Sequence, residues 1–200
     1  GQADYALEAY AAEMSLAITA YYLSLAIFIP ASGWIADRCA ARTVFQVAVG
    51  IFTIASVLCG TSNSLFELLA ARVLQGFGAA LMDPVARLII LRSFPKGDLV
   101  RAMSWFTIPG LLGPALGPPL GGFLTDYASW RWIFFINLPV GILGFGLVTS
   151  FIENYREPES PSLDWVGFLL SGTSIASLVY ACDQVARPDA GAALALALFG

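Results

Sequence analysis

The stretch MSLAITAYYLSLAIFIPASGWIA, residues 14–36, carries no charged side chain between Glu13 and Asp37. A helix that crosses the hydrocarbon core of a bilayer needs about 20 consecutive apolar residues, so these 23 residues are long enough to span a membrane. Similar stretches recur along the chain. The pattern predicts an all-α fold, a polytopic bundle of membrane helices.

The other charge-free stretches have comparable lengths. They are residues 43–66 and 102–125 with 24 residues each, residues 132–152 with 21, and residues 165–182 with 18. Residues 68–91 form a further apolar stretch that only Arg72, Asp83 and Arg87 interrupt, and another apolar run occupies residues 191–200. We therefore expect six complete spans and the beginning of a seventh.

The composition excludes several classes of protein. The 200 residues are 58% hydrophobic and 12% charged, with a mean hydropathy of +0.76, whereas soluble domains are about 25% charged. Ten Lys and Arg against 14 Asp and Glu leave no basic surface for nucleic acid. The chain has no His and no CxxC spacing, so we expect no metal and no cofactor. Cys39, Cys59 and Cys182 are expected to be small buried hydrophobic residues.

The distribution of Lys and Arg in the loops predicts the orientation in the membrane. Alternate loops form two sets: residues 37–42, 92–101 and 153–164 carry six positive side chains, and residues 61–67, 126–131 and 183–189 carry two. Because cytoplasmic loops are enriched in Lys and Arg, the first set is predicted to face the cytoplasm.

Three ionisable side chains lie within the apolar stretch 68–91, where charge is costly. Asp83 and Arg87 are four residues apart, so they share a helix face and are expected to pair. Arg72 has two interpretations. Its side chain either extends to the outer membrane interface or faces a central polar cavity.

Residues 102–125 combine glycine and proline in an unusual way. Gly113, Gly117 and Gly121 recur every fourth residue and form one bare stripe on a helix, against which a neighbouring helix could pack closely. The same stretch contains Pro109, Pro114, Pro118 and Pro119. Because each proline removes a backbone hydrogen bond, we expect a bent, tightly packed helix.

Four segments resemble sequence motifs of one family. They are GWIADRCAAR (33–42), RVLQGFGAA (72–80), GLLGPALGPPLGG (110–122) and WRWIFFINLPVG (130–141). In this order they resemble the major facilitator superfamily, and within it the fourteen-helix drug:proton antiporters. The first motif departs from the family pattern at Ala40, where Gly is usual, and at Ala41, where a basic residue is usual. The lost glycine is expected to strain the turn.

The resemblance implies the following organisation. Residues 1–153 are an N-terminal transporter bundle without its first helix, residues 154–163 are a cytoplasmic linker, and residues 164–200 are the truncated extra central helices. The spans are then helices 2 to 7 and the start of helix 8. The acidic residue that the family carries in helix 1, and the second half of the transporter, are expected in a longer chain.

The resemblance also implies roles for individual residues. The gating residues on the cytoplasmic side are Gly33, Asp37, Arg38 and Arg42, and the proton-coupling candidates are Arg72 and Asp83. The antiporter motif that packs against the opposite half comprises Gly113, Pro114, Gly117, Pro118, Gly121 and Gly122. Tyr21, Tyr22, Phe106 and Phe135 are candidate side chains of a substrate pocket.

These features favour a proton-coupled antiporter that exports drug-like or amphiphilic small molecules, in a bacterial inner membrane. Its expected partners are the lipid bilayer, the substrate, protons and the second half of the same chain. A sugar or metabolite facilitator of the same superfamily and a non-transporting membrane sensor remain alternatives. An enzyme is not expected, because the spans contain no His, no cysteine pair and no clustered carboxylates.

Overall fold

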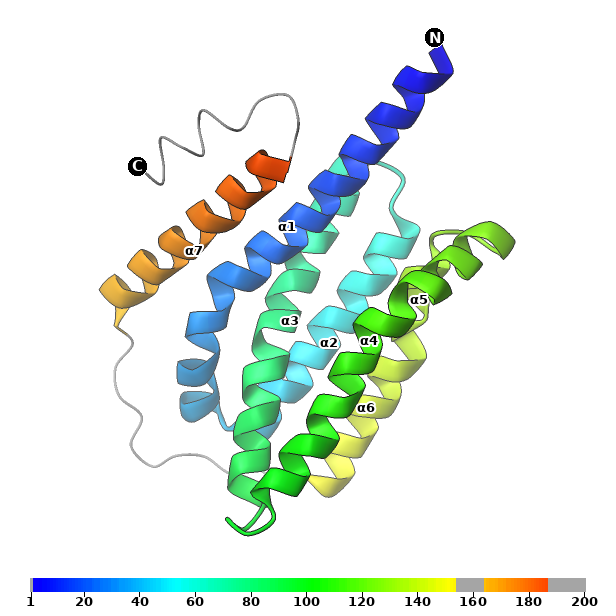
Figure 1. The fold of residues 1–200 in the computed structure, drawn as a ribbon. Helices are drawn as coiled ribbons and strands as arrows, with labels where there is room; N and C mark the ends of the chain where they lie inside the picture. Colours follow the sequence, from blue (N-terminus) through cyan, green and yellow to red (C-terminus); the bar gives the residue numbers. More distant parts are fainter. Residues whose placement is uncertain (1, 154–163, 187–200) are drawn as a thin grey trace.

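The computed structural model describes residues 2–153 and 164–186, and these residues are helical apart from short connections (Figure 1). The helices are α1 (Gln2–Cys39), α2 (Ala41–Thr61), α3 (Leu65–Ser93), α4 (Leu99–Tyr127), α5 (Trp132–Phe135), α6 (Asn137–Phe151) and α7 (Trp165–Ala186). The described residues contain no strand. The predicted all-α bundle is therefore confirmed.

Each of the six complete predicted spans coincides with a helix or, for residues 132–152, with α5 and α6 together. Four segments of the described chain are long and apolar enough to cross a membrane: Met14–Ala36, Ala41–Thr61, Leu65–Ser93 and Trp132–Phe151. Helix α4 is as long as α3, but its glycines and prolines lower its hydropathy. Helix α7 contains a shorter apolar segment, Trp165–Ala181. The predicted seventh span, residues 191–200, lies outside the described residues.

The helices run antiparallel, so the connections alternate between the two ends of the bundle (Figure 1). The short connections at Ala40 and at residues 94–98 lie at one end, together with the C-terminal end of α6. The connection between α2 and α3 lies at the other end. Among the described loops, residues 37–42 and 92–101 therefore lie at the end opposite residues 61–67, as the orientation analysis requires.

Helix α3 is the centre of the packing. It contacts α1 and α2 over most of its length, and α2 also contacts α5 and α6. Two glycines of α3 allow this close approach. A Cβ added at Gly76 would lie 2.5 Å from the carbonyl oxygen of Tyr21, and one added at Gly78 would lie 2.9 Å from the backbone nitrogen of Phe52. Two close helix crossings therefore occur at the second motif.

Two clusters of buried apolar side chains lie among these helices. One comprises Ala36, Ala41, Val44, Ala48, Leu81, Val85 and Ile89, and the other comprises Ala17, Cys59, Leu68, Ala71 and Phe134. Cys59 is fully buried, as predicted. The prediction was wrong for Cys39, which is exposed because it ends α1 beside a loop. The side chain of Cys182 lies outside the described part of the chain.

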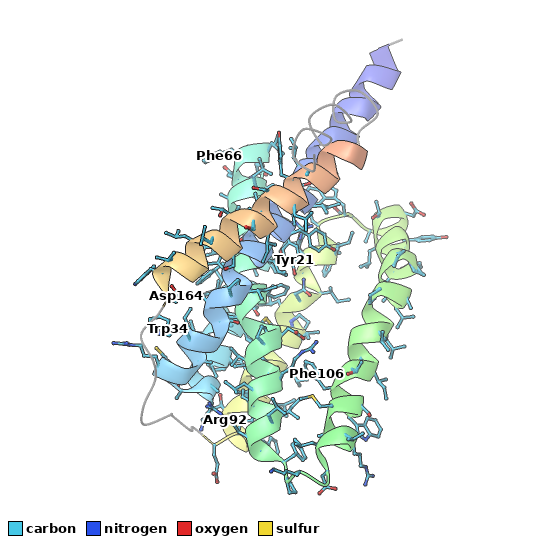
Figure 2. All side chains as sticks on the ribbon, turned by 60° about the vertical axis from the view of Figure 1, so that its left-hand side comes forward. Tyr21, Trp34, Phe66, Arg92, Phe106 and Asp164 are labelled. Carbon is cyan, nitrogen blue, oxygen red and sulfur yellow. The ribbon has the colours of Figure 1, made fainter. Side chains whose placement is uncertain are left out.

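Helix α4 lies at the side of the bundle and buries none of its residues (Figure 2). It remains helical through its four prolines. A Cβ added at Gly113 or Gly117 would meet no atom within 4 Å, and one at Gly121 would meet only the end of the Ile133 side chain, at 3.9 Å. No described residue packs closely on this stripe, so the close packing expected there stays a prediction about segments beyond the described residues.

The outward side chains fit a bilayer environment. Leu111 of α4, Leu143 of α6 and Leu169 of α7 are each more than half exposed. Large apolar side chains exposed in such number are rare on monomeric soluble proteins and mark contact with lipid or with another protein. The chain is an integral membrane protein.

A short break separates α5 from α6 at Ile136, although both helices continue in the same span. Pro139 has no N–H, so the carbonyl of Phe135 lacks its usual helical donor, four residues ahead. The amide of Ile136 still donates to the carbonyls of Phe134 and Trp132. The break places Asn137 at the start of α6, facing α2.

We predict that Ala40→Gly stabilises the protein. Ala40 has φ 67° and ψ 127°, and it is the one non-glycine residue with positive φ in the described segments. Such a conformation costs about 1–3 kcal/mol for a residue with a Cβ, so the free energy of unfolding in detergent should rise by about 1 kcal/mol. Ala41→Gly is the matched control. It is the first residue of α2, in ordinary helical conformation, where glycine relieves no strain and should not raise stability. Equal effects of the two changes would contradict the strain at Ala40.

We also predict that Cys39 faces the cytoplasm. In a protein whose Cys59 and Cys182 are replaced by Ala, a membrane-impermeant thiol reagent should label Cys39 only after the inner face of the membrane is opened. The exposed position of this thiol makes the native residue a suitable probe. Labelling of Cys39 in intact cells would show that the predicted orientation in the membrane is reversed.

Candidate functional site

Arg72 of α3 points into the bundle and is half-buried. Its Nη1 donates a hydrogen bond to Gln75 Oε1 at 3.0 Å. The guanidinium lies 4.9 Å from the ring centroid of Phe134 and 5.5 Å from that of Tyr21, two cation–π contacts. These partners lie on α5 and α1 inside the bundle, which favours the inward orientation over a side chain that extends to the membrane interface.

One donor of Arg72 has no acceptor among the described residues. Its Nε is buried and makes no hydrogen bond there. A buried N–H without a partner costs about 1–3 kcal/mol, so this position favours an acceptor supplied by another group. The partners among the described residues are an amide and two aromatic rings, which carry no formal charge, so no described side chain compensates the positive charge of Arg72.

The amide of Gln75 continues this arrangement into a buried polar chain. Gln75 is 2% exposed and its Nε2 donates to Ser56 Oγ at 2.6 Å. Asn137 Nδ2 donates to the same oxygen at 3.0 Å. Cys59 Sγ lies 3.9 Å from Gln75 Oε1, on the side that faces Arg72. Side chains of α2, α3 and α6 therefore meet within the membrane beside Arg72.

Asp83 and Arg87 form the expected pair. Arg87 Nε lies 3.0 Å from Asp83 Oδ2, and both side chains are about 60% exposed. The Arg87 guanidinium also lies 5.7 Å from the ring centroid of Phe106 on α4. Asp83 is 11 residues beyond Arg72, about 16 Å along the helix axis, so the structure does not bring these two proton-coupling candidates together.

The loop motif at 33–42 lies at the end of the bundle opposite the α2–α3 connection. Arg38 lies 5.5 Å from the ring of Trp34. Arg42 Nη2 donates to the carbonyl of Thr149 at 2.7 Å, near the C-terminal end of α6, where a positive charge is favourable. Gly33 is exposed with no atom within 4 Å of an added Cβ. The side chain of Asp37 lies outside the described residues.

The four candidate pocket aromatics do not gather around one cavity. Tyr21 contacts Arg72 and the exposed Tyr22, whereas Phe106 contacts Arg87 at a different level of the bundle (Figure 2). Phe135 covers Gly60, where an added Cβ would lie 2.8 Å from its ring. Of the four, Tyr21 is the one whose ring contacts the Arg72 guanidinium.

Sequence reasoning overlooked Ser56, Asn137 and Phe134. Ser56 is one of several small hydroxyl residues in the stretch 43–66, beside Thr53 and Thr61, and gives little signal. Asn137 is an amide inside a charge-free span, and such groups usually have hydrogen-bond partners because unpaired polar groups are costly in a bilayer. That rule could have identified Asn137 as a site residue. Phe134 has no distinguishing signal among 14 phenylalanines.

The family comparison is consistent with this arrangement. A family model described as Major Facilitator Superfamily matches residues 4–200. The chain belongs to that family, whose members are transporters rather than enzymes.

Curated relatives extend the comparison. The chain is 46% identical over 170 residues to a Cronobacter sakazakii protein named "Putative multidrug resistance protein MdtD", and 46% identical to the protein of the same name from Pectobacterium carotovorum. An Escherichia coli relative of that name is 45% identical. These matches cover 85% of this chain and 36% of each relative, so the chain spans about a third of their length.

We predict that Gly117→Leu in the full-length protein stalls transport without loss of membrane insertion. Nothing within 4 Å opposes a larger side chain at Gly117 or Gly122 in the described bundle, so both variants should fold. If a further helix packs on the stripe, overpacking at Gly117 costs typically 1–3 kcal/mol and shifts the access equilibrium about tenfold. Gly122 lies about 100° around the helix and should tolerate Leu.

The measurement is efflux and membrane level for Gly117→Leu beside Gly122→Leu. Gly76→Leu provides a reference for a fold-breaking change, because its side chain would meet the backbone of Tyr21. Equal efflux in the two α4 variants would show that the stripe does not face a packing partner.

Proposed function

We propose that this chain is part of a proton-coupled antiporter that exports drug-like or amphiphilic small molecules across a bacterial inner membrane. The observation that carries the proposal is Arg72, a half-buried cation within a membrane span whose described partners are neutral. Intramembrane ionisable residues are costly and usually mark ion or substrate pathways. The relatives are named as putative multidrug resistance proteins, which supports export of drug-like compounds.

A fixed cation in this position provides a means of coupling. A positive charge favours the ionised form of a nearby carboxylate and so promotes release of its proton. The buried Nε of Arg72 has no acceptor in the described chain and is suited to such a carboxylate. We place that acid in a segment of the longer protein, as the resemblance to the family implies. The exported substrate and the proton would then compete for one charged centre.

The loop motif is proposed as the cytoplasmic latch. Arg42 already joins α2 to α6 through the carbonyl of Thr149. Gln46 reinforces this connection, because its Nε2 donates to Thr149 Oγ1 at 2.7 Å. These bonds give the latch a rigid base on this half, and Gly33, Asp37 and Arg38 would meet the second half of the transporter.

We predict that Arg72→Ala abolishes proton-driven export by the full-length protein and leaves its membrane level largely unchanged. Arg72→Lys should restore export in part, because Lys keeps the charge but lacks the forked geometry that contacts Gln75. The measurement is efflux of a fluorescent amphiphilic dye from vesicles with an imposed proton gradient. Arg101→Ala is the matched control, an exposed arginine on α4.

The same assay separates the alternatives. Export that proceeds equally with and without a proton gradient in the parent protein would indicate a facilitator, and no export of any substrate would favour a sensor. Undiminished export by Arg72→Ala would show that Arg72 has no part in coupling.

A further inference from the structure

Ser56 is an unusual residue for its position. It lies in the C-terminal half of α2, is fully buried, and is hydrogen-bonded to side chains of α3 and α6. Its hydroxyl oxygen accepts two hydrogen bonds, from Gln75 Nε2 at 2.6 Å and from Asn137 Nδ2 at 3.0 Å. A buried hydroxyl at this depth must have partners, because lipid supplies none. The two amides provide them.

The bonds at the two ends of the Gln75 amide together set its orientation. The oxygen of Ser56 has two acceptor positions, and N–H donors of Gln75 and Asn137 occupy both. The NH2 group of Gln75 thus faces Ser56, and its carbonyl oxygen faces the opposite way. That oxygen accepts from Arg72 Nη1 at 3.0 Å. The reversed amide would direct its NH2 group at the guanidinium, leaving two donors face to face without an acceptor.

Asn137 connects this series of hydrogen bonds to the helix segment that carries Phe134, an aromatic contact of Arg72. It begins α6, three residues after Phe134, whose ring lies 4.9 Å below the guanidinium. The segment around the α5–α6 break is therefore linked to Arg72 in two ways, one direct and one indirect. Phe134 touches one face directly, and Asn137 acts on the edge through Ser56 and Gln75.

We propose that Ser56 and Asn137 are positioning residues of the Arg72 centre, which orient the Gln75 amide so that its carbonyl holds the guanidinium. The proposal rests on the proposed function, because it deepens the account of the same site. Neither residue touches Arg72, so each acts only through Gln75. The order of donation is Arg72 to Gln75, Gln75 to Ser56, and Asn137 to Ser56.

The first test is export by variants of the full-length protein. Ser56→Ala removes the double acceptor without adding volume, and should lower the maximal export rate at least fivefold with KM unchanged within twofold. Ser56→Thr keeps the hydroxyl and should stay within twofold of the parent rate. Ser32→Ala is the matched control: Ser32 is 1% exposed and its hydroxyl donates only to the carbonyl of Ile29. It should not change export.

A double variant separates positioning from a general structural effect. Residues that act through one intermediate are non-additive, so Ser56→Ala with Asn137→Ala should export about as fast as Ser56→Ala alone. Membrane level and thermal midpoint are measured for each variant. Three results would overturn the proposal. They are a loss of export that parallels a fall in the thermal midpoint, a double variant whose loss of export is the product of the two single losses, and failure of Ser56→Thr to retain the parent rate.

The second test does not depend on transport. In bilayers, solid-state NMR of the labelled full-length protein should detect dipolar contact between Gln75 Cδ and the guanidino nitrogens of Arg72. The contact should persist in Ser56→Thr and Ser32→Ala and disappear in Ser56→Ala. A contact that persists in Ser56→Ala would overturn the positioning role. Absence of export by the parent protein, with the NMR contacts as expected, would instead count against the proposed function alone.

Discussion

The positive charge of Arg72 inside the membrane is the constraint on which the surrounding structure depends. A guanidinium is always charged, so the protein must surround it with groups that substitute for water. It does so with one carbonyl oxygen and two aromatic faces, from Gln75, Phe134 and Tyr21. These partners come from three helices, and their arrangement around Arg72 requires α1, α3 and α5 to meet at one level of the bundle.

Helix α3 makes this meeting possible because it carries both the charge and the small residues beside it. Gly76 follows Gln75 directly and lets the backbone of α1 approach, which brings Tyr21 over Arg72. Gly78 performs the same role toward α2, where Ser56 receives the Gln75 amide. The motif RVLQGFGAA therefore combines a buried cation, its orienting amide and two helix crossings within nine residues. We infer that these features form one functional unit.

Local patterns in the sequence were enough to predict the helices and some contacts. The scarcity of charge located the spans, the four-residue spacing predicted the Asp83–Arg87 pair, and the lost glycine predicted the strain now seen at Ala40. These features depend on neighbours in the chain. The hydrogen bonds of Ser56 join residues that are far apart in the sequence: Gln75 is 19 positions away and Asn137 is 81. No local pattern indicates which helices meet, so this part of the site required the three-dimensional structure. The glycine stripe of α4 has the same limit: the four-residue spacing predicts a bare helix face but does not identify the helix that packs on it.

The central claim is that Arg72 points into the bundle and does not reach the lipid headgroups. The most direct measurement is solid-state NMR of the full-length protein in phospholipid bilayers, with label in the arginine guanidino carbon and in the phenylalanine rings. The Arg72 signal is identified by its absence from Arg72→Lys. The account predicts dipolar contact between the Arg72 guanidino carbon and a phenylalanine ring, Phe134, and none with lipid phosphorus. Contact with phosphorus and none with phenylalanine would contradict it.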